Sequence, residues 1–431
     1  MIHFRSVCIS AHLDPLCRTL DRLSKGNFLF VFQTHDQGAM RRKIGWDANT
    51  SYRAVPDSPE AQCEAKDVDL LVTGLKETSL FESRVRNGRV TVYSSERWFK
   101  PRKILGVWVP GILKLISPAY RHEATRIARL LDTTYLYAMP IGVHAVRDMA
   151  RLSGILHGVW SCFFAAPQLV FEACAGGRVL TAAEAREHGL LQENEEQHLR
   201  DNGFVVVPCE RWPRQVRSSC RKLGLANMRL GGYYVAAHDG CGMGCKRTTK
   251  DFNLLWVGRY LKCKCVPTIV QAFKKVLASC PAASLLLVGE GGERARCLRI
   301  AGGLAVNSEE PKWVPGKIVF SPFVRNDTVR RLMREATLYI MASNAIEGWG
   351  AVVSEAIIEG CPVISSIEVG SAATMLPPER LFHAGNVEAL TSLILKMNGG
   401  DDAVQASDWS GEVAAEKIMS FANERRANEG H

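Results

Sequence analysis

The chain of 431 residues is 47% hydrophobic and 23% charged, which is an ordinary globular mixture. That composition allows a large buried core and excludes a disordered chain, and the length suits two or three domains. The formal net charge of +10 at pH 7 indicates an anionic ligand or surface: a nucleoside diphosphate, an acidic lipid or a nucleic acid. Charge alone does not choose among these partners.

The 14 cysteines occur without a signal peptide, so we expect reduced thiols in a cytoplasmic protein. Zinc binding is the alternative for one set of four cysteines. The spacings in that set differ from common zinc patterns, and reduced, apolar cysteines are therefore favoured. The set is Cys241, Cys245, Cys263 and Cys265.

Two apolar segments, residues 104–120 and 154–171, are interrupted by proline and polar residues. Both fall short of the roughly 20 clean apolar residues that cross a membrane. The first could lie on a membrane surface, because Arg102, Lys103 and Lys114 suit anionic headgroups, and a helix packed in the core is the alternative. We expect a cytoplasmic protein, with peripheral contact to the inner face of the cytoplasmic membrane as an option.

Residues 1–210 are predicted to form an α/β domain that opens as a βαβ unit. Short apolar runs predict its strands, and apolar residues at helical spacing predict its helices. The strands are expected at residues 6–10, 28–33, 68–73, 89–93, 178–180 and 203–208, and the helices at 16–24 and 119–131.

Two histidines of this domain follow expected strands or turns. His12 comes just after the first strand, and His144 opens a helical run after Pro140 and Gly142. Either side chain could reach a crevice at the strand ends, although a lone histidine is more often structural. We keep both as candidates for the acceptor side of a site.

Residues 211–250 are the expected linker, because hydrophobic periodicity fades there while arginines and glycines accumulate. A basic stretch can bind nucleic acid, but this one lacks aromatic residues arranged in a recognisable module. A solvated linker is favoured, and no nucleic-acid partner is expected.

Residues 251–410 are predicted to form a second α/β domain. Its first strand, residues 253–257, is followed by Gly258, Arg259 and Lys264. A glycine at a strand end lets the chain turn close to a ligand, and two cations five positions apart can clamp a diphosphate. Two ordinary surface cations are the alternative.

A second glycine, Gly289, ends the next expected strand, residues 284–288. The turn Gly-Glu-Gly-Gly fails as a dinucleotide fingerprint, because Arg294 occupies the third glycine position. Helices are also expected at 266–278 and 327–336, and a strand at 317–320.

Residues 337–360 predict a strand, a loop and a helix, and the strand that follows completes a βαβ crossover. Glu347 lies in the loop, at the sheet edge where open α/β sheets bind ligands. The helix begins near Ala351, after Gly350, so its free N–H groups are a ready phosphate site. Glu355 lies roughly 6 Å further along the axis and can bind a vicinal diol. A nucleotide sugar carries both groups.

The spacing of Glu347 and Glu355 resembles the E-x7-E signature of retaining GT-B glycosyltransferases, in particular family 4, also called glycosyl transferases group 1. Gly258-Arg259, Lys264 and the Gly289 turn occur in the same order in that family, so the resemblance covers about residues 253–395. Residues 92–100 and 135–149 are similar to the N-terminal half of bacterial polysaccharide transferases. Two features depart from the family: residues 10–14 replace its Gly-Gly loop, and Cys265 stands where glycine is usual.

The resemblance implies two Rossmann-like domains with parallel sheets facing across a cleft. Residues 1–210 would hold the acceptor, residues 251–410 the donor, and the helix within 411–431 would pack back on the first domain. The donor would be a nucleotide sugar and the acceptor a glycan or lipid-linked saccharide in cell-surface polysaccharide biosynthesis.

The resemblance also implies the roles of the site residues. Arg259 and Lys264 would stabilise the departing diphosphate, Glu355 would bind the ribose hydroxyls, and Glu347 would contact the donor sugar. Whether Glu347 acts as a nucleophile or as an electrostatic group stays open. No metal or other cofactor is expected, because Arg259 and Lys264 already supply the positive charge that a metal ion would bring. The nucleotide-binding candidates are Gly258, Gly289, Gly350, Ala351 and Glu355.

Two other functions are alternatives. A binding-only protein with this fold is one, because Cys265 and the missing Gly-Gly loop depart from the family. A nucleotide-sugar epimerase of related fold is the other. Analysis of products formed without acceptor separates the two, because an epimerase converts the donor alone.

Overall fold

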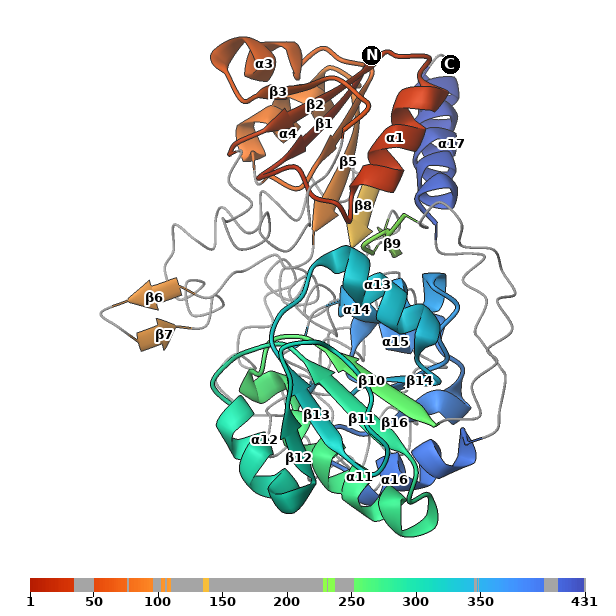
Figure 1. The fold of residues 1–431 in the computed structure, drawn as a ribbon. Helices are drawn as coiled ribbons and strands as arrows, with labels where there is room; N and C mark the ends of the chain where they lie inside the picture. The colour runs from red at the N-terminus through yellow and green to blue at the C-terminus, as the bar shows by residue number, and fades with distance from the viewer. Residues whose placement is uncertain are drawn as a thin grey trace, which may run out of the picture. The chain divides into compact units, whose positions relative to one another are not determined.

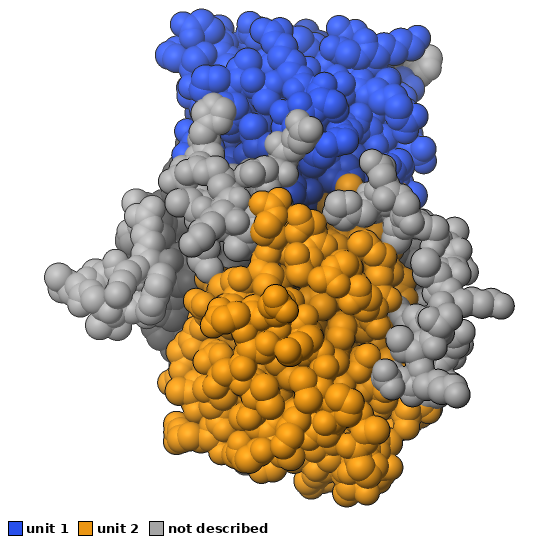
Figure 2. Space-filling view, viewed as in Figure 1, with its two compact units in different colours: residues 1–37, 48–233, 411–431 blue, residues 38–47, 234–410 orange. Residues whose placement is uncertain are grey.

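The computed structural model separates into two compact units, each described here by itself (Figures 1 and 2). Unit 1 comprises residues 1–37, 48–233 and 411–431, and unit 2 comprises residues 38–47 and 234–410. The structure describes residues 1–34, 50–75, 77–95, 102–104, 107–109, 135–138, 228–230, 232–236, 252–344, 347, 349–398 and 410–429. The expected strands at 178–180 and 203–208 and the expected helix at 119–131 lie outside these residues.

Unit 1 is built on a sheet of seven strands in the order β3-β2-β1-β4-β5-β8-β9, and every pair of neighbours is parallel. Strand β2 (Phe28–Phe32) shows why these residues form a sheet, because all five are apolar and buried. Continuous apolar runs are typical of parallel strands covered on both faces. The other strands are β1 (Ile2–Ser6), β3 (Ala54–Pro56), β4 (Leu70–Thr73), β5 (Val90–Ser95), β8 (Tyr135–Ala138) and β9 (Met228–Leu230).

The helices of unit 1 are α1 (Asp14–Leu23), α3 (Pro59–Glu64), α4 (Thr78–Arg86) and α17 (Gly411–Glu429). Helices α1 and α17 lie side by side (Figure 1). Their approach requires a glycine, because a Cβ at Gly411 would lie 2.5 Å from the carbonyl carbon of Pro15. The last helix of the chain therefore packs within the N-terminal unit.

The first strand differs from the prediction. It runs over Ile2–Ser6 instead of residues 6–10, and the chain after Ser6 forms bends and turns ahead of α1. His3 and Arg5 interrupt the apolar pattern of β1, although both are fully buried. A buried arginine requires partners from elsewhere in the fold, and the local sequence does not show them.

Two further segments of the N-terminal half also differ in detail. Strands β6 (Arg102–Ile104) and β7 (Val107–Val109) form an antiparallel pair, so residues 107–109 of the apolar segment 104–120 are extended. Within the expected linker, residues 211–250, strand β9 joins the sheet of unit 1. Among the helices that the structure describes, none combines the length and apolarity needed to cross a membrane.

Unit 2 also contains a parallel seven-stranded sheet, in the order β12-β13-β11-β10-β14-β15-β16. The predicted strands at 253–257 and 284–288 match β10 and β11 to the residue. The strands are β10 (Asn253–Val257), β11 (Ser284–Val288), β12 (Ala305–Asn307), β13 (Ile318–Ser321), β14 (Leu338–Met341), β15 (Val363–Ser366) and β16 (Leu381–Phe382).

Helices alternate with these strands, which gives the Rossmann-like order of an open α/β sheet. The predicted helices at 266–278, 327–336 and 351–359 appear with ends shifted by at most one residue. Helices α12, α15 and α16 were not predicted. The helices are α11 (Val266–Ser279), α12 (Arg294–Ala301), α13 (Asn326–Glu335), α14 (Ala351–Ile358), α15 (Gly370–Met375) and α16 (Val387–Lys396).

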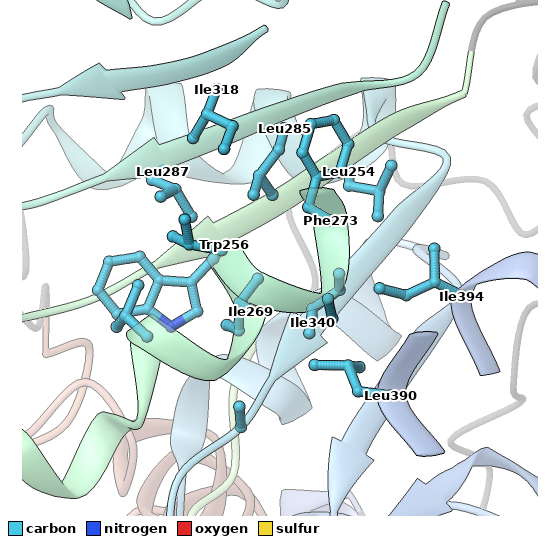
Figure 3. Packing of buried hydrophobic residues seen from close by; sticks show 14 of the residues in the cluster. Leu254, Trp256, Ile269, Phe273, Leu285, Leu287, Ile318, Ile340, Leu390 and Ile394 are labelled. Carbon is cyan, nitrogen blue, oxygen red and sulfur yellow. The ribbon is translucent and has the colours of Figure 1, made fainter. Parts of the chain in front are cut away.

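The core of unit 2 lies on both faces of its sheet. On one face, Trp256, Phe273 and Leu285 pack with residues of α11 and α16 (Figure 3). On the other face, Tyr339 and Met333 pack with residues of α13 and α14. Each fully buried large apolar side chain contributes about 1.5–3 kcal/mol, so the two clusters fix the sheet that carries the site.

Candidate functional site

The candidate donor site lies at the carboxyl edge of the sheet of unit 2. Strands β11, β10 and β14 are neighbours in that sheet. Gly289 follows β11, Gly258 follows β10, and Glu347 lies in the loop after β14. Parallel neighbours end at the same edge, so the fold brings together three residues that are far apart in the sequence.

The two strand-end glycines pack backbone against backbone. Gly289 has a φ of 142°, and a Cβ added there would lie 1.8 Å from the carbonyl oxygen of Gly258. Gly291, which the sequence analysis did not single out, also has a φ of 142°, and its Cβ would lie 2.7 Å from the oxygen of Tyr260. Only glycine allows the backbones of these turns to approach so closely.

Lys264 and Glu347 form an ion pair between Nζ and Oε2. Both side chains are largely buried, with 13% and 15% of their surface exposed. Backbone hydrogen bonds fasten the two loops together, since the N–H of Asn344 donates to the carbonyl of Cys263 at 2.8 Å. The N–H of Glu347 in turn donates to the carbonyl of Asn344 at 2.9 Å. The structure thus brings together two of the three predicted catalytic residues.

Arg259, the third of them, comes directly after Gly258 and is exposed. Its carbonyl accepts a hydrogen bond from the N–H of Leu261 at 2.8 Å, which turns the chain toward the 3₁₀ turn Lys262–Lys264. An exposed guanidinium beside a backbone turn is free to approach an anion from solvent, whereas Lys264 is fixed in place by Glu347.

Cys265 occupies the position where glycine is usual in the resembling family, and its backbone explains that preference. Its φ is 48°, in the left-handed region, immediately before α11 begins at Val266. Burial, with a further contribution from Glu368, raises the pKa of Cys265 to about 11. Burial, followed by the charge of Glu347, also raises the pKa of Cys263. Both thiols stay protonated at neutral pH, so neither is suited to act as a nucleophile.

The amino end of α14 is held by the loop that follows β15. Gly350 has a φ of 73°, and a Cβ there would lie 2.4 Å from a methyl group of Val369. Ser371 donates twice, from its N–H to the carbonyl of Trp349 at 2.8 Å and from Oγ to the carbonyl of Gly350 at 3.0 Å. Gly350 provides no side-chain cap, so the first N–H groups of the helix, from Ala351 onward, can bind an anion.

Glu355 lies one turn inside α14 and is 2% exposed. The charge of Glu355 acts on Tyr339. Burial is the largest cause that raises the pKa of the Tyr339 phenol, and the charge of Glu355 is the second. Tyr339 donates from its hydroxyl to the carbonyl of Val257 at 3.3 Å. Glu355 is thus more deeply buried than Lys264 and Glu347, whose side chains are 13% and 15% exposed.

The acceptor-side candidates belong to unit 1. His12 lies in the loop after β1, and its ring centroid is 5.2 Å from that of Tyr233. His144 lies outside the described residues, as do Cys241 and Cys245 of the alternative zinc set. Among the residues that the structure does describe, no group of three or more possible metal ligands occurs.

Sequence reasoning missed three residues that shape the donor site: Gly291, Asn344 and Ser371. The second glycine of the Gly289 turn was a signal for Gly291, because an alternating pair of glycines indicates two close backbone approaches. Asn344 and Ser371 hold loops together through hydrogen bonds to residues far from them in the sequence. The local sequence pattern gives no sign of those partners.

Comparison with known proteins agrees with this arrangement. The model of the family "Glycosyl transferases group 1" matches residues 251–398. A curated mannosyltransferase from Corynebacterium glutamicum, which uses GDP-mannose to modify a monoacylated phosphatidylinositol monomannoside, is 24% identical over 171 residues. The match covers 36% of this chain and 42% of that protein, so the chain spans less than half of the relative's length.

Solved structures match along the whole chain at low identity. A glycosyltransferase from Rickettsia africae has a TM-score of 0.50 at 12% identity, with 99% of each chain covered. HepE of Anabaena, solved in complex with UDP, has a TM-score of 0.46 at 13% identity, with 100% of this chain and 99% of that chain covered. Residues 251–398 thus match the family of glycosyl transferases group 1, within a chain that has the α/β fold of the GT-B glycosyltransferases.

Proposed function

We propose that the protein is a retaining, family 4 glycosyltransferase that moves a sugar from a nucleoside diphosphate to a glycan or lipid-linked saccharide. The observation that supports this most is the Lys264–Glu347 ion pair, set beside the Gly258 and Gly289 turns at the carboxyl edge of the sheet. A diphosphate needs cations and accessible N–H groups, which Arg259, Lys264 and the uncapped amino end of α14 can supply. The family match over residues 251–398 supports the same assignment.

In this proposal each charged residue meets a part of the donor. The bond between the anomeric carbon and the diphosphate oxygen breaks, and Arg259 and Lys264 stabilise the negative charge that the diphosphate gains. Glu347, held by Lys264, faces the positive character that develops at the anomeric carbon. The acceptor hydroxyl then forms the new bond on the same face of the sugar and passes its proton to the departing diphosphate, so the configuration is retained. Glu355, deeper in the site, binds the ribose hydroxyls.

Cys265 supports an active enzyme over a binding-only protein. The departure from glycine would disable the site if it displaced Lys264. The backbone of Cys265 instead adopts the left-handed conformation that a glycine would take, and Lys264 reaches Glu347. Lys264 is thus held against Glu347 without a glycine at position 265.

We also propose that the reaction needs no metal, that it serves cell-surface polysaccharide biosynthesis, and that the protein works in the cytoplasm with peripheral membrane contact. The net charge of +10 supports contact with anionic headgroups. The cations at the donor edge supply the charge that a metal would otherwise bring.

Binding and turnover test the proposal in two steps. Guanosine or uridine diphosphate should raise the melting temperature, since a ligand at 100 times its Kd stabilises a protein by about 2.7 kcal/mol. Sugar transfer from the matching nucleotide sugar should then survive EDTA. Loss of activity with EDTA and recovery with magnesium would refute metal independence. Conversion of the donor without any acceptor would identify an epimerase instead.

A further inference from the structure

An arginine is completely buried at the carboxyl edge of the sheet of unit 1. Arg5, on β1, donates from Nη2 to both carboxylate oxygens of Asp57, at 3.1 and 3.2 Å. It donates to Glu77 from Nε at 3.1 Å and from Nη2 at 2.8 Å. We call Arg5, Asp57 and Glu77 the Arg5 cluster.

The Arg5 cluster lies where an open α/β sheet binds its ligands. Asp57 directly follows β3, and Glu77 follows β4 just ahead of α4. Because β3, β1 and β4 are parallel strands of one sheet, their carboxyl ends share an edge. Strands β1 and β3 and helix α4, which carry or adjoin the cluster, are labelled in Figure 1.

The two carboxylates are accessible although the arginine is not. The side chain of Arg5 has no exposed surface, whereas those of Asp57 and Glu77 are 14% and 22% exposed. A carboxylate accepts about four hydrogen bonds. Asp57 also accepts one from Nε2 of Gln62 at 3.3 Å, so Arg5 and Gln62 use only part of the capacity of the two carboxylates. The free acceptor sites of Asp57 and Glu77 can therefore meet hydrogen-bond donors from solvent.

The charges of the cluster do not balance, since one cation faces two carboxylates. His3, also on β1, does not restore the balance, because burial and then the charge of Arg5 lower its pKa to about 4. Nη1 of Arg5 is buried and has no hydrogen-bond partner among the described residues. The cluster thus carries net negative charge and an unsatisfied buried donor.

A purely structural role explains this arrangement poorly. Removing an arginine and two carboxylates from water costs several kcal/mol per ion, and apolar residues of similar size are often as stable or more so. A net charge of one further sets the cluster apart from a neutral structural ion pair. The arrangement instead holds two carboxylates in fixed positions at the ligand edge, which is the geometry that binds adjacent hydroxyl groups.

We propose that Asp57 and Glu77, oriented by Arg5, bind vicinal hydroxyl groups of the acceptor saccharide. This rests on the proposed function, since a glycosyltransferase needs a saccharide site on its acceptor domain. The net negative charge selects an uncharged part of the acceptor. Phosphate groups, such as those of a lipid-linked saccharide, would be repelled from the cluster and must lie elsewhere.

The test measures binding of simple glycosides to the full chain by saturation-transfer NMR, with excess GDP and UDP present to fill the donor site. The probes are the methyl glycosides of mannose, glucose, galactose and N-acetylglucosamine. We expect at least one to bind, and Asp57→Asn and Glu77→Gln each to weaken it at least tenfold. Glu64→Gln is the control, because that carboxylate ends α3, is 57% exposed and lies outside the cluster.

Two measurements keep the outcome clear. Calorimetry with GDP and UDP shows whether the donor site works in each variant, so a failure of the proposed function is seen separately. On the wild-type protein, the 6-phosphate of the sugar that binds should displace the bound glycoside at least tenfold less well than the unphosphorylated methyl glycoside of the same sugar does. Three results would overturn the inference: no glycoside binds, the cluster variants bind like Glu64→Gln, or the phosphate ester competes equally well.

Discussion

The two units share a parallel sheet of seven strands, yet different charged groups lie at the carboxyl edges of those sheets. In unit 2, Arg259 and Lys264 lie beside glycine turns with Glu347 as their carboxylate. In unit 1, a single arginine, Arg5, is outnumbered by Asp57 and Glu77. The same topology is thus used for different ligands, because the residues that follow the strands decide the chemistry of the edge.

The two edges also differ in how they hold their charges. The Lys264–Glu347 pair is one cation on one carboxylate, and both groups keep some contact with solvent. Arg5 is wholly buried and uses its guanidinium to fix two carboxylates that reach solvent. The cation is the group available to a ligand in unit 2, and the carboxylates are available in unit 1.

Removing the two cations of unit 2 that we propose bind the diphosphate should have the largest effect on ligand binding. The double substitution Arg259→Ala and Lys264→Ala should cost about 2–5 kcal/mol of diphosphate binding, because Glu347 is then left without its partner. Calorimetry with GDP and UDP measures the loss. The control is Lys274→Ala with Lys275→Ala, two cations on α11 whose Nζ atoms bond to Ile300 and Glu388. Full diphosphate affinity in the Arg259/Lys264 variant would show that the cations were misassigned.

Glu347→Gln should slow the reaction while leaving donor binding nearly intact. The carboxylate is proposed to act on charge that develops only in the transition state, so kcat should fall by about 10²–10³-fold. Glu355→Gln is the matched comparison, because a ribose contact is made equally in ground and transition states and should mainly raise KM. Steady-state kinetics of both variants measure the difference. A normal kcat for Glu347→Gln would remove that residue from the catalytic role.

The third prediction concerns the backbone of the donor edge. Gly289→Ala should lower the free energy of unfolding by at least about 2 kcal/mol, because its Cβ would lie 1.8 Å from the oxygen of Gly258. Gly292→Ala is the control, since nothing lies within 4 Å of its added Cβ. Urea unfolding of both variants gives the comparison. Equal stabilities would mean that the strand ends can separate at little cost.

The fold of unit 2 was easier to predict than that of unit 1 for a physical reason. Strands β10 and β11 are apolar runs between polar turns, so their limits show in the sequence. Strand β1 contains His3 and Arg5, whose burial depends on tertiary partners. Asp57 and Glu77 lie 52 and 72 positions from Arg5, and no local pattern connects residues at that distance.

The candidate site likewise has parts that could be predicted from the sequence and parts that could not. The placement of Gly258, Gly289, Lys264 and Glu347 at one edge followed from strand ends that the sequence shows. The ion pair between the last two did not follow, because it depends on the loop contact of Asn344 with Cys263. The left-handed conformation of Cys265 was also hidden, since cysteine gives no sign of a positive φ.

The smallest expected effect is a change in stability that comes from the left-handed backbone of Cys265. It tests how firmly the turn before α11 holds Lys264 in position. A left-handed conformation costs an L-residue about 1–2 kcal/mol and costs glycine almost nothing, although glycine loses more entropy on folding. Cys265→Gly should therefore be more stable than Cys265→Ala by about 1 kcal/mol, since both lose the same sulfur and only the alanine keeps the strain. Thermal unfolding measures the difference, and diphosphate affinity should be equal in the two variants if Lys264 stays paired with Glu347. A Cys265→Ala protein as stable as Cys265→Gly would show that the turn before α11 relaxes, and that the position of Lys264 does not depend on it.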